Sequence, residues 1–344
     1  MQDVMGRLRL PPSQPLPPKS SVKISVLGAG AWGTALAKVL HERHHAVTLW
    51  GHAARLADLA RSHRNESLLP GVELPSDWRL ETDLGRALEG SDLALLAVPS
   101  EAFRAVAQQT GSFAGIALSV CKGIEHSTLL TMSQVLRQTT PRATPVALSG
   151  PSLALEVAQG IPTALVAASE DETAARVVQD LFHRPTLRVY TTTDLRGVEL
   201  GGALKNVMAI AAGVCDGLHL GDNAKAALIT RGLAEMRRLG VACGARVETF
   251  NGLSGLGDLM VTCFSEKSRN RTLGERLAKG EPLADALARA TAEGHPTARS
   301  AHHLAQRMGI AAPIIDEVHA ILYAGKNPAQ AVRDLMTRES RPED

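Results

Sequence analysis

Residues 22–42 read VKISVLGAGAWGTALAKVLHE, and this stretch decides the fold. The apolar run 22–27 leads directly into a glycine-rich loop, 28–33, and a helical pattern follows. In a strand–turn–helix unit, such glycines allow a tight turn, a close approach of the backbone to a pyrophosphate, and close packing of the helix on the strand. The stretch therefore predicts a dinucleotide site. A glycine turn without a ligand is the alternative.

The rest of the chain extends this unit into an α/β fold followed by helices. Apolar runs at 22–27, 46–50, 93–98, 116–120, 145–148 and 163–166 predict strands, and helical patterns at 31–43, 53–63, 100–109, 128–138, 152–159 and 171–182 lie between them. Such alternation is typical of a doubly wound, mostly parallel sheet. We predict an N-terminal Rossmann domain over 21–193 and an all-helical C-terminal domain over 194–344.

Composition limits the classes of function. The 344 residues carry a net charge of +2, and the excess lies in residues 1–20, where Arg7, Arg9 and Lys19 outnumber Asp3. The neutral remainder argues against general nucleic-acid binding, which needs a basic surface. Residues 1–20 contain five prolines between positions 11 and 18 and are predicted to form a flexible tail.

No segment reads as a membrane anchor or a metal site. We find no apolar run of about 18 residues and no apolar core of a signal peptide, so we expect no transmembrane segment. The spacing of the four cysteines matches no zinc motif, which favours free thiols in a reducing cytoplasm. We therefore expect a cytoplasmic protein with no metal.

The end of the second predicted strand bears on the choice of dinucleotide. An acidic residue there would bind the adenine ribose of NAD(H) and repel a 2′-phosphate. This chain has His52 and Arg55, and its first acid, Asp58, lies inside the next predicted helix. The sequence predicts that NADP(H) is accepted alongside NAD(H). The alternative is that His52 and Arg55 are ordinary solvated residues.

Two lysines are candidates for chemistry on a substrate. Lys122 follows the apolar run 116–120, where a cation is costly unless it meets a charge. Lys205 follows Gly201 and Gly202 on the same face of a predicted helix, so either a ligand approaches the backbone there or the helix packs closely on the first domain. Crowding would lower the pKa of Lys205 towards working pH, as acid–base catalysis requires.

The segments after residue 254 add polar groups. Asp258 and Thr262 are i,i+4 neighbours if the segment is helical. Ser268 is placed to cap a helix that starts with Arg269 and Asn270, an arrangement that predicts a phosphate site. Lys267 and Arg271 are expected to be solvated.

Together these segments resemble the bacterial type of NAD(P)-dependent glycerol-3-phosphate dehydrogenase. The resemblance covers residues 22 to about 335 and rests on the segments 28–33, 122–123, 149–152, 201–206, 255–262 and 268–270. It implies interconversion of dihydroxyacetone phosphate and sn-glycerol 3-phosphate, with NADP(H) or NAD(H) as cofactor. The chain departs from the family at Leu153, where an aromatic residue is usual, and at Cys121, where Thr is common.

The resemblance also implies roles for individual residues. Lys205 would be the proton donor and acceptor, Lys122 would contact both substrate and cofactor, and Asp258 would orient Lys205 or bind a substrate hydroxyl. The other residues expected in the substrate site are Gly150, Ser152, Ser268, Arg269 and Asn270. Those expected to contact the dinucleotide are Gly28, Gly30, Ala31, Trp32, Gly33, His52, Ala154 and Glu293, together with Lys122 and Arg269.

Two other functions stay open at this point. A related dehydrogenase of a hydroxy acid or of ketopantoate would share the glycine loop and the helical lysine, but would not need a phosphate site at 268–270. A dinucleotide-sensing or scaffold protein would show no turnover. A homodimer is a further hypothesis.

Overall fold

A single eight-stranded sheet forms the first part of the molecule. The computed structural model describes residues 21–289 and 291–339, so the predicted tail lies outside the described residues. The strand order is β3-β2-β1-β4-β5-β6-β7-β8, and all neighbouring pairs are parallel except β6 and β7. The strands are β1 (Lys23–Leu27), β2 (Ala46–Trp50), β3 (Arg79–Glu81), β4 (Leu93–Leu96), β5 (Ile116–Ser119), β6 (Thr144–Ser149), β7 (Thr163–Ala168) and β8 (Leu187–Thr192).

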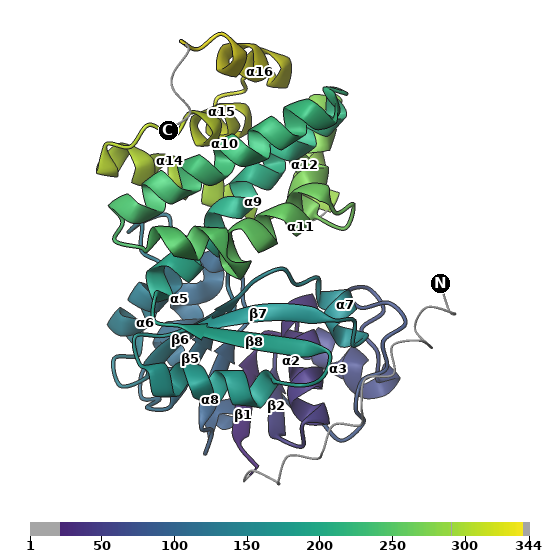
Figure 1. Ribbon diagram of the computed structural model, residues 1–344. Helices are drawn as coiled ribbons and strands as arrows, with labels where there is room; N and C mark the ends of the chain where they lie inside the picture. The colour runs from purple at the N-terminus through teal and green to yellow at the C-terminus, as the bar shows by residue number, and fades with distance from the viewer. Residues whose placement is uncertain (1–20, 290, 340–344) are drawn as a thin grey trace.

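Helices connect most of the strands and cover the sheet (Figure 1). They are α2 (Ala31–Glu42), α3 (Ala53–Ser62), α4 (Leu84–Leu88), α5 (Ser100–Gln109), α6 (Met132–Thr139), α7 (Ala154–Ala158) and α8 (Glu172–Phe182). Strands β1, β4, β5 and β6 are almost fully buried, which explains why they read as continuous apolar runs.

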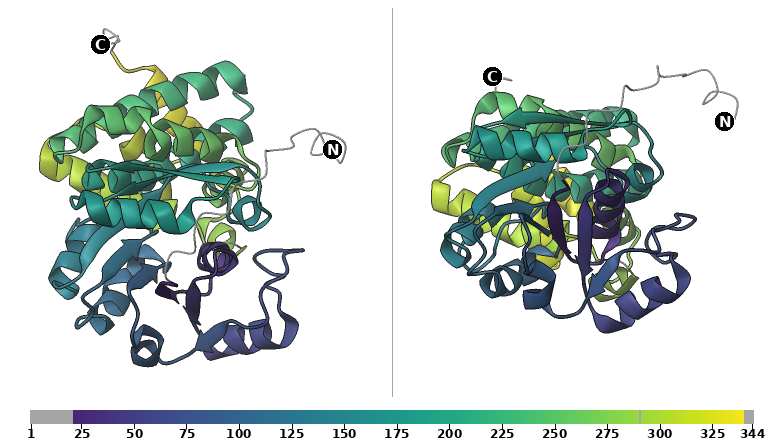
Figure 2. Two further views of the ribbon diagram at one scale, coloured as in Figure 1. Left: turned by 60° about the horizontal axis from the view of Figure 1, so that its bottom comes forward. Right: turned by 90° about the horizontal axis from the view of Figure 1, so that it is seen from below.

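The second part of the molecule is helical and lies on one side of the sheet part, as Figures 1 and 2 show from three directions. Its elements are α9 (Leu195–Gly217), α10 (Gly221–Ala242), a 3₁₀-helix (Val247–Asn251), a π-helical turn (Leu253–Gly257), α11 (Asp258–Phe264), α12 (Arg269–Ala278), α13 (Leu283–Arg289), α14 (Gly294–Met308), α15 (Pro313–Tyr323) and α16 (Pro328–Met336). The predicted fold class, a Rossmann sheet followed by helices, is confirmed.

Helix α9 is the core of the helical part and also contacts the sheet. Its first turn packs Leu195 and Val198 against Ala147 of β6 and Val166 of β7. Although it contains no uninterrupted apolar run of about 18 residues, this helix is long enough and on average apolar enough to cross a membrane. Every residue of its most apolar 18-residue window is buried in the protein, as in the core helix of a globular fold.

The structure contains elements that the sequence analysis did not predict. Strand β8 lies at the sheet edge with alternating buried and exposed residues, and β3 is only three residues long. Helix α4 was also missed. Helix α6 begins at Met132 rather than 128, because Thr131 forms a capping box with Gln134 and pairs as a bridge with Ile124.

Candidate active site

The glycine loop between β1 and α2 requires glycine at two positions, Gly28 and Gly33. Gly28 has φ +126°, and a Cβ there would lie 2.4 Å from the carbonyl oxygen of Ala97. A Cβ on Gly33 would lie 2.0 Å from the carbonyl oxygen of Gly28. By contrast, a Cβ on Gly30 would meet no atom within 4 Å, so the loop backbone is open on that side.

The start of helix α2 is suited to an anion. Its N-cap is Gly30, which has no side chain to accept hydrogen bonds from the first-turn N–H groups of Ala31, Trp32 and Gly33. The indole Nε1–H of Trp32 is buried and has no hydrogen-bond partner within the described part of the chain. Donors without partners beside an open glycine fit the pyrophosphate of a dinucleotide.

The end of β2 carries positive and neutral groups. His52 is the exposed N-cap of α3, and Arg55 is exposed one turn later. Asp58 is paired with Arg61 at 2.7 Å. Among residues 21–289 and 291–339, Arg55 has no carboxylate partner, so its guanidinium is available to a 2′-phosphate.

Two lysines and one aspartate form a buried cluster between the two parts of the molecule. Lys122 follows β5, Lys205 lies in α9, and Asp258 is the first residue of α11. Lys122 Nζ lies 2.5 Å from Asp258 Oδ2, and Lys205 Nζ lies 2.9 Å from Oδ1. Asp258 is 1% exposed and Lys205 6%, so the carboxylate and the Lys205 ammonium group are shielded from water, and Lys122 is partly buried beside them.

Electrostatics in this cluster favour an easily transferred proton on Lys205. Burial lowers its pKa, Asp258 raises it and Lys122 lowers it, and the net shift is downward. Burial raises the pKa of Asp258, but the two ammonium groups outweigh burial and keep the carboxylate ionised. The predicted direction for Lys205 is therefore confirmed.

Two residues that the sequence analysis did not place in the site hold this cluster in position. Thr262 Oγ1 accepts a hydrogen bond from Lys205 Nζ at 2.8 Å and donates to the carbonyl oxygen of Asp258 at 2.6 Å. Asn206 Nδ2 donates to the carbonyl oxygen of Lys122 at 3.2 Å. The signal for Thr262 was its i,i+4 spacing from Asp258, and that for Asn206 was a polar amide next to Lys205 in a largely apolar helix.

The turn after β6 lies against Lys122. Gly150 has φ +132°, and its carbonyl oxygen accepts hydrogen bonds from Lys122 Nζ at 3.0 Å and from Ser152 Oγ at 2.9 Å. Ala154 starts the short helix α7 that follows. A Cβ on Gly202 would lie 2.7 Å from Ser149 Oγ and 3.5 Å from Lys122 Cγ, so close packing against the sheet part explains this glycine.

The predicted phosphate site at the start of α12 is built as a helix N-terminus. Ser268 is the N-cap, and its Oγ accepts from the N–H of Arg271 at 3.2 Å. Arg269 is exposed. Asn270 is buried, donates from Nδ2 to Asn206 Oδ1 at 2.9 Å, and accepts from the N–H of Gly294 at 2.9 Å. One amide N–H of Asn270 is left for a ligand.

The expectation that Arg271 and Lys267 are solvated is wrong for Arg271. Its side chain is 15% exposed, and Nε lies 2.5 Å from Asp216 Oδ2, which also binds Lys225. The helix turns Arg271 towards α9 and away from the site. Lys267 is 56% exposed and pairs with Glu156 at 2.9 Å.

Glu293 lies beside these cations at the N-cap of α14. Burial raises its pKa, and the charges of Arg269, Lys205 and Lys122 oppose burial only in part, so the net shift is upward. The carboxyl group of Glu293 therefore feels the charges of both Arg269 and the lysine cluster. It is therefore a carboxyl group that holds a proton more readily than usual, near the proposed substrate.

Comparisons with known proteins agree along most of the chain. Residues 23–175 match the model of the NAD-dependent glycerol-3-phosphate dehydrogenase N-terminus, and residues 194–333 match the model of its C-terminus. A glycerol-3-phosphate dehydrogenase [NAD(P)+] from Syntrophotalea carbinolica is 48% identical over 94% of this chain and 99% of its own length. The enzyme of the same name from Geobacter sulfurreducens is 49% identical, again over 94% and 99%.

Solved structures give the same result. The crystal structure of glycerol-3-phosphate dehydrogenase from Coxiella burnetii superposes with a TM-score of 0.89 at 38% identity, covering 92% of this chain and 99% of that one. A ketopantoate reductase from Ralstonia eutropha reaches a TM-score of 0.59 at 16% identity, covering 90% and 100%. The second similarity shows the fold alone.

Proposed function

The chain belongs to the family of NAD(P)-dependent glycerol-3-phosphate dehydrogenases, and from this membership we propose which of its residues carry the reaction. The protein is an oxidoreductase that acts on a CH–OH group and interconverts dihydroxyacetone phosphate and sn-glycerol 3-phosphate with NAD(P)(H). The open alternatives, a hydroxy-acid dehydrogenase and a protein without turnover, are therefore set aside. The buried arrangement of Lys122, Asp258 and Lys205 is the observation that supports the assignment below.

In the proposed site, Lys205 moves the proton. In the reductive direction the Lys205 ammonium donates a proton to the oxygen that forms on C2, and in the oxidative direction the neutral amine takes it back. The lowered pKa of Lys205 supports both roles, because general acid–base catalysis works best when the pKa lies near the working pH. When bound, the dinucleotide supplies or accepts the hydride.

Lys122 and Asp258 prepare Lys205 for this step. Lys122 polarises the substrate oxygen and, as a second cation near Asp258, lowers the pKa of Lys205. Asp258 bridges both ammonium groups, and Thr262 fixes Lys205 Nζ by a second contact. Gly150 and Ser152 shape the wall beside Lys122.

The start of α12 binds the substrate phosphate in this proposal. Ser268 caps the helix, Arg269 supplies the exposed guanidinium, and Asn270 contributes its remaining amide N–H. Holding the phosphate there fixes the carbonyl in position for hydride transfer. Gly28, Gly30, Ala31, Trp32 and Gly33 would hold the dinucleotide. Further contacts to it would come from His52, Ala154, Glu293, Lys122 and Arg269.

The decisive test is the Lys205→Met variant. Because positioned acid catalysis is worth roughly 10²–10⁴-fold, kcat for NADPH oxidation with dihydroxyacetone phosphate should fall by at least 100-fold. NADPH binding, measured by calorimetry, should change little. Lys267→Met, which removes an exposed lysine paired with Glu156, is the matched control and should keep full activity. A Lys205→Met enzyme with more than about a tenth of the wild-type kcat contradicts the assignment.

Arg269→Ala tests the phosphate site separately. The KM for dihydroxyacetone phosphate should rise at least ten-fold, as expected for losing a charge-assisted hydrogen bond, while turnover of unphosphorylated dihydroxyacetone should not change. Arg276→Ala, in the last turn of the same helix, is the control. An unchanged KM in Arg269→Ala removes the guanidinium from the phosphate site.

Several broader statements belong to the same proposal. We propose that residues 21–193 and 194–344 are the two domains and that the product serves phospholipid synthesis. The four cysteines are all free, which supports a location in the reducing cytoplasm. A homodimer is the proposed assembly, and sedimentation equilibrium would measure it.

A further inference from the structure

Five histidines gather where α14, α15 and the segment after β5 meet. They are His126, His295, His302, His303 and His319. The rings of His302 and His319 stack with centroids 4.0 Å apart and planes 8° from parallel, and His126 lies 5.3 Å from His303. None of these residues belongs to the active site proposed above.

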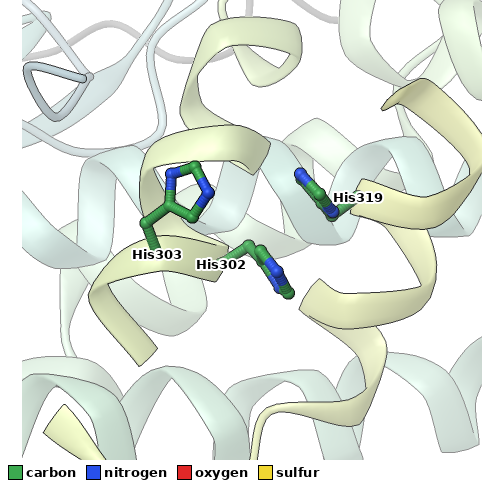
Figure 3. Close-up of side chains that lie close together, drawn as sticks. All are labelled: His302, His303 and His319. Atoms are coloured by element: carbon green, nitrogen blue, oxygen red, sulfur yellow. The ribbon is translucent and has the colours of Figure 1, made fainter. Parts of the chain in front are cut away.

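Three of the five bring their ring nitrogens together. One ring nitrogen from each of His302, His303 and His319 lies within 4.8 Å of the other two. Figure 3 shows the three rings in the space between two helices, with His302 and His303 on α14 and His319 on α15. All three side chains are partly buried, so they are confined but reachable from solvent.

Hydrogen bonds set the protonation of His302. Its Nδ1 lies 2.8 Å from Asp316 Oδ1, and a carboxylate can only accept, so the proton is on Nδ1. Its Nε2 lies 3.0 Å from Gln306 Nε2, an amide donor, which places a lone pair on Nε2. A histidine whose Nδ1–H is held by a carboxylate and whose Nε2 carries a lone pair is the usual arrangement of a metal-bound histidine.

We propose that His302, His303 and His319 form a binding site for a divalent transition-metal ion, Zn²⁺ in the first instance. Imidazole nitrogen is a preferred ligand of Zn²⁺ and also suits Co²⁺ and Ni²⁺, whereas Mg²⁺ and Ca²⁺ prefer oxygen. Three histidines leave the fourth tetrahedral position for water. Asp316 is a positioning residue that orients His302 from outside the ligand set.

The site needs a modest rearrangement to close on the ion. Zinc–nitrogen bonds of about 2.0–2.1 Å in a tetrahedron bring ligand nitrogens to about 3.3 Å from each other. The three nitrogens therefore have to approach by up to about 1.5 Å, and the ring of His319, which stacks on that of His302, has to turn so that its lone pair converges with that of His302 while Asp316 holds His302 in place. Rotation about the broad χ2 torsion of histidine supplies this motion, and Gln306 releases His302 Nε2 as the ion enters.

Binding would add a link between two helices that already meet through apolar packing and through the His302–Asp316 contact. Ligands from α14 and α15 joined by one ion hold the two helices together, and the close approach of His126 to His303 extends the contact to the sheet part. An ion that binds only the folded protein stabilises it by mass action. Zn²⁺ should therefore raise the melting temperature without being needed for turnover.

The test uses the full chain without an affinity tag, freed of metal by EDTA and dialysis. Titration with ZnCl₂ in a calorimeter at pH 7.5 should give one ion per chain with a dissociation constant of micromolar order. At a Zn²⁺ concentration of about 100 times this constant, the melting temperature should rise by several degrees. MgCl₂ at the same concentration should give no shift.

Single substitutions then locate the ion. His303→Gln and His319→Gln should each weaken Zn²⁺ binding by about 100-fold, and Asp316→Asn by about ten-fold through the loss of orientation of His302. His183→Gln, outside the cluster, is the control. A variant in which Cys121 and Cys263 are both Ser tests thiols as the competing ligands and should bind like the wild type. Dehydrogenase activity of each variant reports folding.

Two results would overturn the proposal. One is the absence of saturable Zn²⁺ binding to the wild-type protein. The other is binding that persists in His303→Gln and His319→Gln but disappears in the cysteine variant, which would place the ion on the thiols.

Discussion

Asp258 is the residue on which the proposed chemistry depends, although it transfers nothing itself. A carboxylate that is 1% exposed costs a large desolvation free energy, which the two ammonium groups of Lys122 and Lys205 offset. The same ion pairs join the loop after β5 to α9 and α11. Asp258 therefore contributes both to the position of the Lys205 ammonium group and to its pKa.

The Asp258→Asn variant should separate the effect of Asp258 on stability from its effect on the pKa of Lys205. The substitution leaves two buried cations without a counter-charge, so the free energy of unfolding should fall by about 3 kcal/mol and the pKa of Lys205 should fall further. In kinetics, the pH above which reductive kcat declines should move downward. Urea unfolding and a pH–rate profile measure the two effects.

Asp216→Asn is a matched control for that variant. Asp216 also holds two cations, Lys225 and Arg271, but they lie outside the proposed site. It should lower stability and leave the pH–rate profile unchanged. If both variants shift the profile equally, Asp258 has only a structural role.

Arg55 tests the choice of cofactor at the scale of one side chain. Arg55→Glu replaces an attraction with a repulsion at the proposed position of the 2′-phosphate, so the KM for NADPH should rise at least ten-fold. The KM for NADH should stay within about two-fold because its ribose carries no phosphate. Arg61→Glu, two turns along and paired with Asp58, should leave the ratio unchanged. Equal effects on NADH and NADPH in Arg55→Glu would argue against the contact.

At the scale of elements, α9 depends on glycine for its contact with α12. A Cβ on Gly213 would lie 1.9 Å from the carbonyl oxygen of Arg271, and one on Gly274 would lie 1.9 Å from that of Ile210. The two backbones therefore touch directly, which no larger residue permits. This contact sets the position of Arg269 and Asn270 relative to Lys205.

Gly213→Ala should break that contact. Alanine is favoured over glycine in a helix by roughly 1 kcal/mol, but a clash with backbone atoms should reverse the sign and cost about 3 kcal/mol. Urea unfolding should show the loss. Gly85→Ala in α4, where the nearest atom is the side-chain oxygen of Asp83 at 3.3 Å, is the control and should be close to neutral. A stable Gly213→Ala enzyme would show that the helices can separate at little cost.

Elements with a strong local pattern could be predicted from the sequence. Strand β2 and helix α5 match their predicted bounds because an apolar run or a helical period begins and ends clearly there. Strand β8 was missed although Leu187 and Val189 alternate with exposed residues, because an edge strand lacks the continuous apolar run of a central one. The antiparallel pairing of β6 and β7 depends on the path of the segment that joins the two strands, and no local sequence pattern predicts that path.

For the site, the sequence likewise predicted individual residues but not the contacts between them. Lys122, Lys205 and Asp258 were identified one by one, since each stands out in its own segment. Their meeting at one carboxylate could not be derived, because 136 residues separate Lys122 from Asp258. Arg271 was misjudged for the same reason, since its partner Asp216 lies 55 residues away.

At the scale of the whole molecule, buried carboxylates hold together elements that are distant in sequence. Glu199 of α9 accepts hydrogen bonds from the N–H and Oγ of Ser133 at the start of α6, which ties the helical part to the sheet part. Glu235 of α10 accepts from the N–H groups of Ile314 and Ile315 at the start of α15. Such groups make the stability of the fold depend on pH.

Glu235 gives the clearest expectation for that dependence. Burial raises its pKa to about 7, although both N–H contacts and the start of α15 favour the charged form. Between its ordinary value of 4.5 and 7, the unfolded chain has lost this proton while the folded protein keeps it. The contribution of Glu235 to the free energy of unfolding is therefore fully present below pH 4.5 and is lost as the pH rises to 7. The free energy of unfolding falls over this range by at most about 1.4 kcal/mol per pH unit.

Glu235→Gln removes the titration and keeps an acceptor oxygen for α15. The free energy of unfolding in urea is measured for the variant and the wild type at pH 5, 6, 7 and 8. The value for the variant minus that for the wild type should rise steadily up to pH 7 and then level off. The exposed Glu266→Gln should run parallel to the wild type. A constant difference between Glu235→Gln and the wild type would mean that the carboxyl stays ionised in the folded protein, because the helix N-terminus then outweighs burial.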